Sequence, residues 1–452
     1  MLLVAVASMR GFHHVPQNPS FAYKLGDPRG AVIAMNGAYG FFYGLLRSST
    51  IRQTPVALPE GISVQDIVDN YVQRTQRSER PLVEANVIYI LLEGWPARIL
   101  QSYGGEKNVA PFFESLRKKS ITTDLTFAGG LRTTEGIFAT FCAWMNPLGQ
   151  SIAKSSLESQ NYICLPHLLR ENGWSSSFFQ GTTKETSGTG ELAQKVGFMQ
   201  SYGKHDVPNF AQLPKHAWGL FDRDVYGFAM DKSKELSEPF ILGINSNSTH
   251  SSELPPGDPA TFGCDNPDSC FYSSFASADR DLEQFFNEYQ KLPHKLPTIW
   301  VMVADHTTKQ KSRIDGFRVP MLIYAPDFVN LSELPKVSVS THRDVGITLA
   351  HILGLNTRSM LGRSLLDAQA PARADYFHQG VLGWVMKDRL YELSVESGEV
   401  VGCYNWRTDT AQMDNLLNKD GPCSRQLKEA QAEALAIVSW SQEKLFSGTI
   451  GK

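Results

Sequence analysis

Apolar runs alternate with amphipathic segments along most of the chain. The first run, NVIYILL at residues 86–92, is rich in β-branched side chains and has the composition of a strand covered on both faces. Similar runs recur as SSSFF, PFILGI, TIWVMVA and VPMLIYA, and amphipathic segments such as 279–292 and 341–355 lie among them. Because strands that alternate with helices build parallel sheets, the pattern predicts an α/β fold: a mostly parallel central sheet flanked by helices.

Several of these elements have recognisable ends. Pro111 opens an amphipathic stretch at 111–120, and the run ITTDLTF at 121–127 follows as a predicted strand. In the later helix, Thr341 is suited to cap the first turn and Gly354 to terminate the last one.

The pattern changes near the C-terminus. From Tyr376 the chain shows short alternating strands, followed by an amphipathic helix at about 427–446, which predicts a small antiparallel sheet with a packed helix. The predicted organisation has three parts: an N-terminal membrane-proximal segment and linker at 1–84, a catalytic α/β domain at 85–372, and the small sheet and helix at 373–452.

Two N-terminal stretches are apolar without being long enough to span a membrane. The start, MLLVAVASM, falls short of the roughly 20 residues a span needs, and no basic region or cleavage site marks it as a signal peptide. Residues 31–48 are aromatic and apolar but interrupted by Asn36, which suits an interfacial helix or one that docks on the main domain. We expect membrane association and a membrane region lost from the N-terminus.

Composition narrows the functional classes. The chain has 452 residues, 42% hydrophobic and 20% charged, which excludes a disordered chain. With 43 Lys and Arg against 46 Asp and Glu, the net charge of -3 lacks the basic excess needed to bind a phosphate backbone. Nucleic acid is therefore not an expected partner.

The six cysteines contain no CxxC pair, so a thiolate zinc cluster is not expected. Their even number and local spacing favour disulfides in an oxidising, extracytoplasmic compartment over six reduced thiols. The spacing is typical of a pair for Cys264 with Cys270 and for Cys403 with Cys423, and Cys142 with Cys164 offers a third pair, while the sequence alone does not determine the connectivity.

Potential metal ligands follow two of the apolar runs. Glu93 comes directly after the first strand, and Asp305 and His306 come directly after TIWVMVA. Ligands of open α/β sheets bind beyond the carboxyl ends of the strands, so these side chains are candidates for one divalent metal site. Mixed carboxylate and imidazole ligands suit Mn²⁺ or Zn²⁺, with Mg²⁺ as a further possibility. The alternative is that each is only a polar residue in a solvated loop.

A threonine stands at the start of a predicted helix. Thr133 lies in the segment GGLRTTEG, between ITTDLTF and the apolar run IFATFCAWM. Free N–H groups at a helix start favour anions, and an adjacent metal would activate a hydroxyl as a nucleophile. Alternatively, Thr133 is an ordinary N-cap with a structural role. Only the presence of the metal-ligand candidates favours a nucleophile over this structural role.

The ordered motifs ILLEGW, GLRTTEGIFA, NSTH, VADHT and RVPMLIYAPD resemble the lipoteichoic acid synthase family, within the sulfatase and alkaline phosphatase superfamily. The resemblance spans about residues 86–362. It implies that Thr133 is the nucleophile and that Glu93, Asp305 and His306 hold one metal ion that also touches the Thr133 oxygen. His250, in NSTH, matches a substrate-contacting histidine that binds a phosphoryl oxygen or protonates the departing alkoxide; a surface-loop histidine is the alternative.

Other positions are less closely matched. Arg132 is expected to pair with phosphate or to face outward, and Thr134 is the second choice as nucleophile. Gram-positive members of the family grip glycerol phosphate with a His, a Trp and an Arg, and this chain lacks them in the segment that begins at Gln180. Gln180 and Lys184 are the expected substrate contacts in their place.

The formylglycine signature of true sulfatases, C/S-x-P-x-R, is absent from the sequence. The resemblance therefore implies a metal-dependent transferase that moves a phosphoglycerol or phosphoethanolamine head group from a phospholipid donor to an envelope glycan or lipid, through a phosphothreonine. A phosphodiesterase or phosphatase of the same superfamily and a non-catalytic envelope interaction module are the alternatives.

Overall fold

The central sheet has six strands in the order β10-β8-β1-β7-β3-β4. The computed structural model describes residues 51–75, 80–308, 313–357, 360–417, 419 and 421–450. All neighbouring strands run parallel except β10, which is antiparallel to β8. The strands are β1 (Asn86–Leu92), β3 (Ser175–Gln180), β4 (Gln200–Tyr202), β7 (Phe240–Asn245), β8 (Thr298–Ala304) and β10 (Met321–Tyr324).

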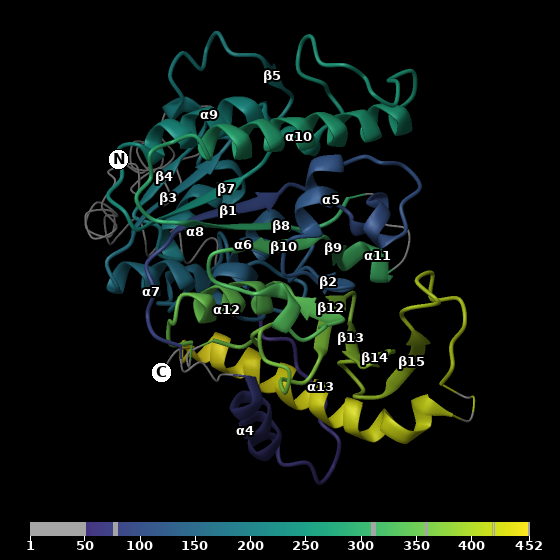
Figure 1. Ribbon diagram of the computed structural model, residues 1–452. Coiled ribbons are helices and arrows are strands. Elements are labelled where there is room, and N and C mark those ends of the chain that lie inside the picture. Colours follow the sequence, from purple (N-terminus) through teal and green to yellow (C-terminus); the bar gives the residue numbers. More distant parts are fainter. Residues whose placement is uncertain are drawn as a thin grey trace, which may run out of the picture.

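Helices cover both faces of this sheet, as Figure 1 shows. On one face α9 (Asp222–Ser233) packs beside α10 (Pro267–Tyr289), and on the other α6 (Thr133–Cys142) packs beside α12 (His342–Ile352). Every residue of β1 is buried, as expected of a strand with helices on both sides. The expected α/β class with a mostly parallel sheet is confirmed.

The segment 121–127 was predicted to form one strand over its whole length, and the structure differs. Only β2 (Leu125–Phe127) forms, and it joins a separate three-stranded sheet between β11 (Val339–Thr341) and β9 (Arg318–Val319). The hydroxyl of Thr123 lies 2.7 Å from that of Thr126 and 3.1 Å from that of Ser340. These side-chain hydrogen bonds tie the segment to β11, whereas Ile121 at its start exchanges two backbone hydrogen bonds with Ile323 of β10 at the edge of the central sheet.

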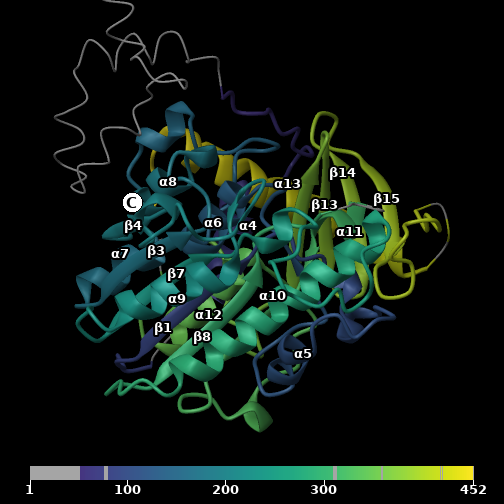
Figure 2. The same ribbon diagram turned by 90° about the horizontal axis from the view of Figure 1, so that it is seen from above.

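The C-terminal strands form a four-stranded antiparallel sheet with α13 (Pro422–Ser447) packed on it, beside the central domain in Figure 2. Glu433 of α13 anchors the contact, because it pairs with Arg373 and accepts a 3.1 Å hydrogen bond from the Trp384 indole. The predicted small sheet and closing helix are confirmed. Its strands are β12 (Arg373–His378), β13 (Val381–Met386), β14 (Arg389–Ser394) and β15 (Val400–Asn405).

Helix ends follow local chemistry. Thr341 is the N-cap of α12, where the Asp344 carboxylate accepts its backbone N–H at 3.0 Å, and Gly354 beyond the last turn has φ +75°. Helix α10 begins twelve residues earlier than the predicted 279–292 segment, because Asn266 caps it by accepting the N–H groups of Asp268 and Ser269.

All six cysteines form disulfides, in the three expected pairs. The first joins the end of the α6 helix to the start of α7 (Leu165–Glu171), and the third joins β15 to α13. The two apolar stretches at 1–9 and 31–48 lie outside the described residues. Within the described part of the chain, no helix combines the length and apolar character needed to cross a membrane.

Candidate functional site

Three strands of the central sheet end at the same edge and carry the candidate site. Leu91 is in register with Asn245 of β7, and Leu92 is in register with Ala304 of β8. The residues that follow, Glu93 after β1 and Asp305 after β8, are therefore neighbours in space although they are distant in sequence. This is the edge at which ligands bind in open α/β sheets.

Glu93, Asp305 and His306 form one cluster, in which the potential ligand atoms all lie within 4.8 Å of one another. His306 Nε2 lies 3.3 Å from Glu93 Oε1 and 3.4 Å from Asp305 Oδ2. The opposite ring nitrogen donates to the Thr307 carbonyl at 3.0 Å, which directs Nε2 toward the carboxylates.

Thr133 faces this cluster from the first turn of α6. Its hydroxyl donates to Glu93 Oε2 at 3.3 Å and lies 3.4 Å from His306 Nε2. Gly136 permits this approach, since a Cβ at that position would lie 2.4 Å from the Asp305 carbonyl oxygen. The structure thus brings together all four residues expected around one metal ion.

The electrostatics of the cluster favour a positive charge at its centre. Burial raises the pKa of Glu93, but the charge of His306 outweighs this and brings the pKa down to about 2. Burial and the Glu93 charge raise the pKa of Asp305 to about 7. Although burial alone would lower it, the two carboxylates raise the pKa of His306 to about 10.

A divalent cation fits this donor set. Asp305 Oδ2 is buried with no hydrogen-bond partner among the described residues, while Oδ1 accepts the N–H groups of Gly94 and His306. The nearest ion-pair partner of Oδ2 is His306 Nε2, 3.4 Å away, and a cation between these two atoms would compensate a buried carboxylate oxygen that makes no hydrogen bond. Two carboxylates and an imidazole nitrogen are ligands that manganese and zinc accept.

Further residues support the cluster without any signal in the sequence. Asn245 donates to Glu93 Oε2 at 3.4 Å, and the Ser246 hydroxyl accepts the Glu93 N–H at 2.8 Å. His342, at the start of α12, accepts the Gly129 N–H through Nδ1 at 3.1 Å and donates through Nε2 to the Ala304 carbonyl at 2.8 Å. His342 therefore ties the loop before Thr133 to the strand before Asp305.

His250 lies beside the cluster on the short helix η7 (Ser248–His250), which follows β7. The neighbouring Thr249 hydroxyl donates to the Glu93 carbonyl, and the charge of His250 acts on the Glu93 carboxylate. His250 is exposed, whereas Glu93 and Asp305 are buried. An imidazole in this place is accessible to a substrate bound over Thr133.

Two further residues expected to contact the substrate, Gln180 and Lys184, lie outside the cluster of Glu93, Asp305 and His306. Gln180 ends β3 in register with Asn245, is buried, and donates to the Thr183 carbonyl at 3.1 Å. Lys184 forms an ion pair of 3.0 Å with Asp206, which partly neutralises it. Neither side chain has a hydrogen bond or ion pair with the cluster among the described residues, so their substrate contacts stay predictions.

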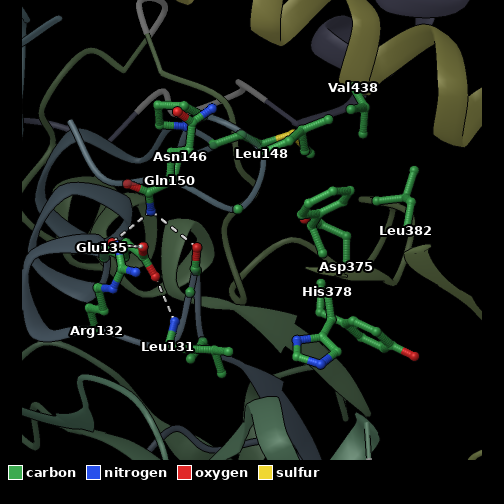
Figure 3. A pocket seen from close by; sticks show the side chains of 18 of the residues that line it. Leu131, Arg132, Glu135, Asn146, Leu148, Gln150, Asp375, His378, Leu382 and Val438 are labelled. Atoms are coloured by element: carbon green, nitrogen blue, oxygen red, sulfur yellow. Dashed lines mark hydrogen bonds and ion pairs between the residues drawn. The ribbon is translucent and has the colours of Figure 1, made fainter. Parts of the chain in front are cut away.

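Arg132 lines a cavity of about 300 Å³ behind the Thr133 loop. Its guanidinium lies 3.6 Å from the Glu135 carboxylate and is largely exposed. In Figure 3, Arg132, Leu131 and Glu135 lie on one side of the cavity, and Asp375 and His378 of the C-terminal sheet lie on the other. Thr133 is not among the residues that line this cavity.

Comparison with known proteins places this geometry in a family. The family model described as Sulfatase matches residues 85–354, more than half of the chain. The chain belongs to the sulfatase family. The matched range contains β1, the Thr133 helix and β8, and hence every residue of the cluster.

Among curated relatives, this sulfatase-family chain is 24% identical over 303 residues to lipoteichoic acid synthase 2 of Bacillus subtilis, covering 61% of this chain and 46% of the relative. It is 26% identical over 262 residues to phosphoglycerol transferase I of Escherichia coli, covering 55% of this chain and 33% of the relative. The chain therefore spans less than half the length of these relatives.

Solved structures agree on the fold. An alkaline phosphatase superfamily protein from Vibrio parahaemolyticus superposes with a TM-score of 0.71 at 20% identity, covering 92% of this chain and 98% of that one. The lipoteichoic acid synthase LtaP from Listeria monocytogenes superposes with a TM-score of 0.66 at 13% identity, covering 85% of this chain and 98% of that one. The expected resemblance to the lipoteichoic acid synthase group of this superfamily is confirmed.

Proposed function

We propose that this sulfatase-family chain is the catalytic part of a metal-dependent transferase that moves a phosphoglycerol or phosphoethanolamine head group from a phospholipid to an envelope glycan or lipid. The single observation that carries the proposal is the hydroxyl of Thr133, held 3.3 Å from Glu93 and 3.4 Å from His306 at a helix start. The names of the relatives, a lipoteichoic acid synthase and a phosphoglycerol transferase, support the reaction class.

The reaction has two displacements at one phosphorus. In the first, the Thr133 hydroxyl loses its proton to solvent and its oxygen bonds to phosphorus, the bond from phosphorus to the diacylglycerol oxygen breaks, and protonated His250 gives its proton to the departing diacylglycerol oxygen. In the second, the acceptor hydroxyl gives its proton to His250 and its oxygen bonds to phosphorus, the bond from phosphorus to the Thr133 oxygen breaks, and Thr133 takes a proton from solvent.

Charge on the phosphoryl oxygens needs compensation in both steps. The backbone N–H groups at the start of α6 point to the side on which Thr133 lies, and His250 adds a hydrogen-bond donor. A divalent cation held by Glu93, Asp305 and His306, with manganese or zinc preferred and magnesium as the third choice, would supply positive charge beside the attacking oxygen.

The proposed setting is the extracytoplasmic face of the bacterial inner membrane. Three disulfides that use all six cysteines support an oxidising compartment. A phospholipid donor requires association with the membrane, for which we propose an anchor outside the described residues.

The decisive experiment is intact-mass and peptide analysis after incubation with phosphatidylglycerol and, separately, with phosphatidylethanolamine. We expect a head-group phosphate adduct on Thr133 and its loss in Thr133→Ala. Thr134→Ala is the matched control, because the Thr134 hydroxyl is buried 2.9 Å from that of Ser151 and does not face the cluster. An adduct that persists in Thr133→Ala and disappears in Thr134→Ala would overturn the assignment.

Hydrolysis by a phosphodiesterase shares the first displacement but uses water in the second. A fluorescent phospholipid separates the two outcomes. Diacylglycerol with a phosphorylated acceptor supports transfer, whereas diacylglycerol with free head-group phosphate, even at saturating acceptor, supports hydrolysis.

A further inference from the structure

An exposed tryptophan stacks on the histidine beside the cluster. The rings of Trp218 and His250 lie 4.0 Å apart between centroids, with 22° between their planes. Trp218 is 46% exposed, one of the most exposed large apolar side chains in the described part of the chain. The Trp218 indole therefore remains partly exposed to solvent instead of being buried in the core, and its ring contacts the His250 imidazole.

The turn that carries Trp218 is held in place from its base. It connects β5 (Lys215–His216) to β6 (Gly219–Leu220), and the Leu220 N–H donates to the Gly181 carbonyl at 2.9 Å. A Cβ on Gly219 would lie 2.1 Å from that same carbonyl oxygen, so the two backbones are in direct contact. The hairpin is thereby fixed to the loop that follows β3.

The same turn is also tied to the segment that carries His250. Asn247 donates to the Leu220 carbonyl at 2.9 Å, and its amide nitrogen lies 2.8 Å from His216 Nε2. On the other side of His250, Glu253 accepts the Ala217 N–H at 3.0 Å. Contacts on both sides of His250 therefore hold Trp218 in register with it.

We propose that Trp218 is a positioning residue, whose indole restricts the imidazole of His250 to one orientation beside the Thr133 centre. His250 is exposed and stands at the end of a three-residue helix, so packing from its own element does little to fix its ring. Aromatic stacking supplies that constraint directly. The inference rests on the proposed function, because it gives His250 a part in the reaction.

The test compares Trp218→Ala and Trp218→Phe in steady-state assays with a phospholipid donor. We expect Trp218→Ala to lower kcat by about tenfold with little change in KM. The substitution affects the orientation of His250 as proton donor and does not affect binding of the phospholipid. Trp218→Phe keeps a ring over the imidazole and should retain kcat to within about threefold. Met199→Ala, at an apolar side chain 44% exposed, is the matched control and should leave kcat and KM unchanged.

A double-mutant cycle with His250→Ala separates positioning from a general structural role. If Trp218 acts through His250, adding Trp218→Ala to His250→Ala should lower kcat no further. The proposal would be overturned if Trp218→Ala lowered kcat equally in the unmodified protein and in His250→Ala. It would also be overturned if a lower melting temperature explained the loss of activity. Full activity of Trp218→Ala would also overturn it while leaving the transferase intact, whereas absence of any Thr133 adduct in the unmodified protein would reject the proposed function itself.

Discussion

Backbone hydrogen bonds hold the Asp305 side chain of the cluster in one orientation. It is fully buried, its Oδ1 accepts two backbone N–H groups, and its Oδ2 has no hydrogen-bond partner among the described residues. These contacts orient one oxygen toward Glu93 and His306, where a cation would engage it.

Asp305→Asn should lower the bound manganese or zinc at least tenfold, because it removes a charged ligand while keeping the size and shape of the side chain. The free energy of unfolding of the metal-free protein should not fall, since a costly buried carboxylate is removed. Elemental analysis and urea unfolding measure the two effects, with the exposed Asp327→Asn as the control. Unchanged metal content would contradict the ligand assignment.

Gly136 determines how closely the Thr133 helix approaches β8. In Gly136→Ala the new methyl group would meet the Asp305 carbonyl, so the helix must move; we expect a loss of about 1–3 kcal/mol in unfolding free energy and loss of the Thr133 adduct. Gly227→Ala is the matched control, since it lies in α9 with no atom within 4 Å of its Cβ. That substitution should stabilise the protein by up to about 1 kcal/mol and keep activity. Equal behaviour of the two variants in unfolding and adduct formation would refute this account.

At the level of elements, the start of α12 joins two loops that no local pattern connects. His342 binds the loop before Thr133 through one ring nitrogen and the end of β8 through the other. This arrangement requires the neutral imidazole, and burial lowers the pKa of His342 from 6.5 to about 4.

The lowered pKa of His342 predicts acid sensitivity. Between pH 6.5 and about 4 the unfolded chain binds the proton more readily than the folded protein, so stability is present above pH 6.5 and is lost as the pH falls. The loss from this residue should reach roughly 3 kcal/mol. His342→Asn should reduce the pH dependence of the unfolding free energy by about one proton, measured by urea unfolding at several pH values; an unchanged slope would show that His342 does not titrate in this way.

At the scale of the whole molecule, two of the three disulfides covalently join separate helices and strands around the core. The Cys403–Cys423 pair, 20 residues apart, joins β15 to α13, and neither of these elements carries a cluster residue. The Cys142–Cys164 pair instead holds the end of the Thr133 helix.

Replacing Cys403 and Cys423 together by serine should lower the unfolding free energy by about 3 kcal/mol, the loop-closure value for this length, while metal uptake persists. The matched replacement of Cys142 and Cys164 should also reduce formation of the Thr133 adduct. Chemical unfolding, elemental analysis and mass spectrometry distinguish the two pairs. Loss of metal in the first double variant would show that the C-terminal sheet supports the cluster directly.

Local patterns were sufficient for much of the architecture. The continuous apolar runs predicted the strands, and the residues after them, Glu93, Asp305 and His306, were identified as ligand candidates because parallel strands expose their carboxyl ends at one edge. Capping residues predicted the limits of α12. The start of α10 was missed because its first half is rich in serine and was not recognised as helical, although Asn266 as N-cap, Pro267 at the first position and Asp268 in the first turn mark it.

What remained depended on contacts between distant segments. His342 and Gly129 are 213 positions apart, and Trp218 reaches His250 because its hairpin packs on Gly181 and is hydrogen-bonded to the segment that carries His250. Periodicity and capping act over a few residues and therefore predict elements and candidate ligands from the amino-acid order itself, and the ordered short motifs indicate the family. The order of strands in the sheet and the packing of loops on it decide which side chains support those ligands, and only the tertiary structure specifies both.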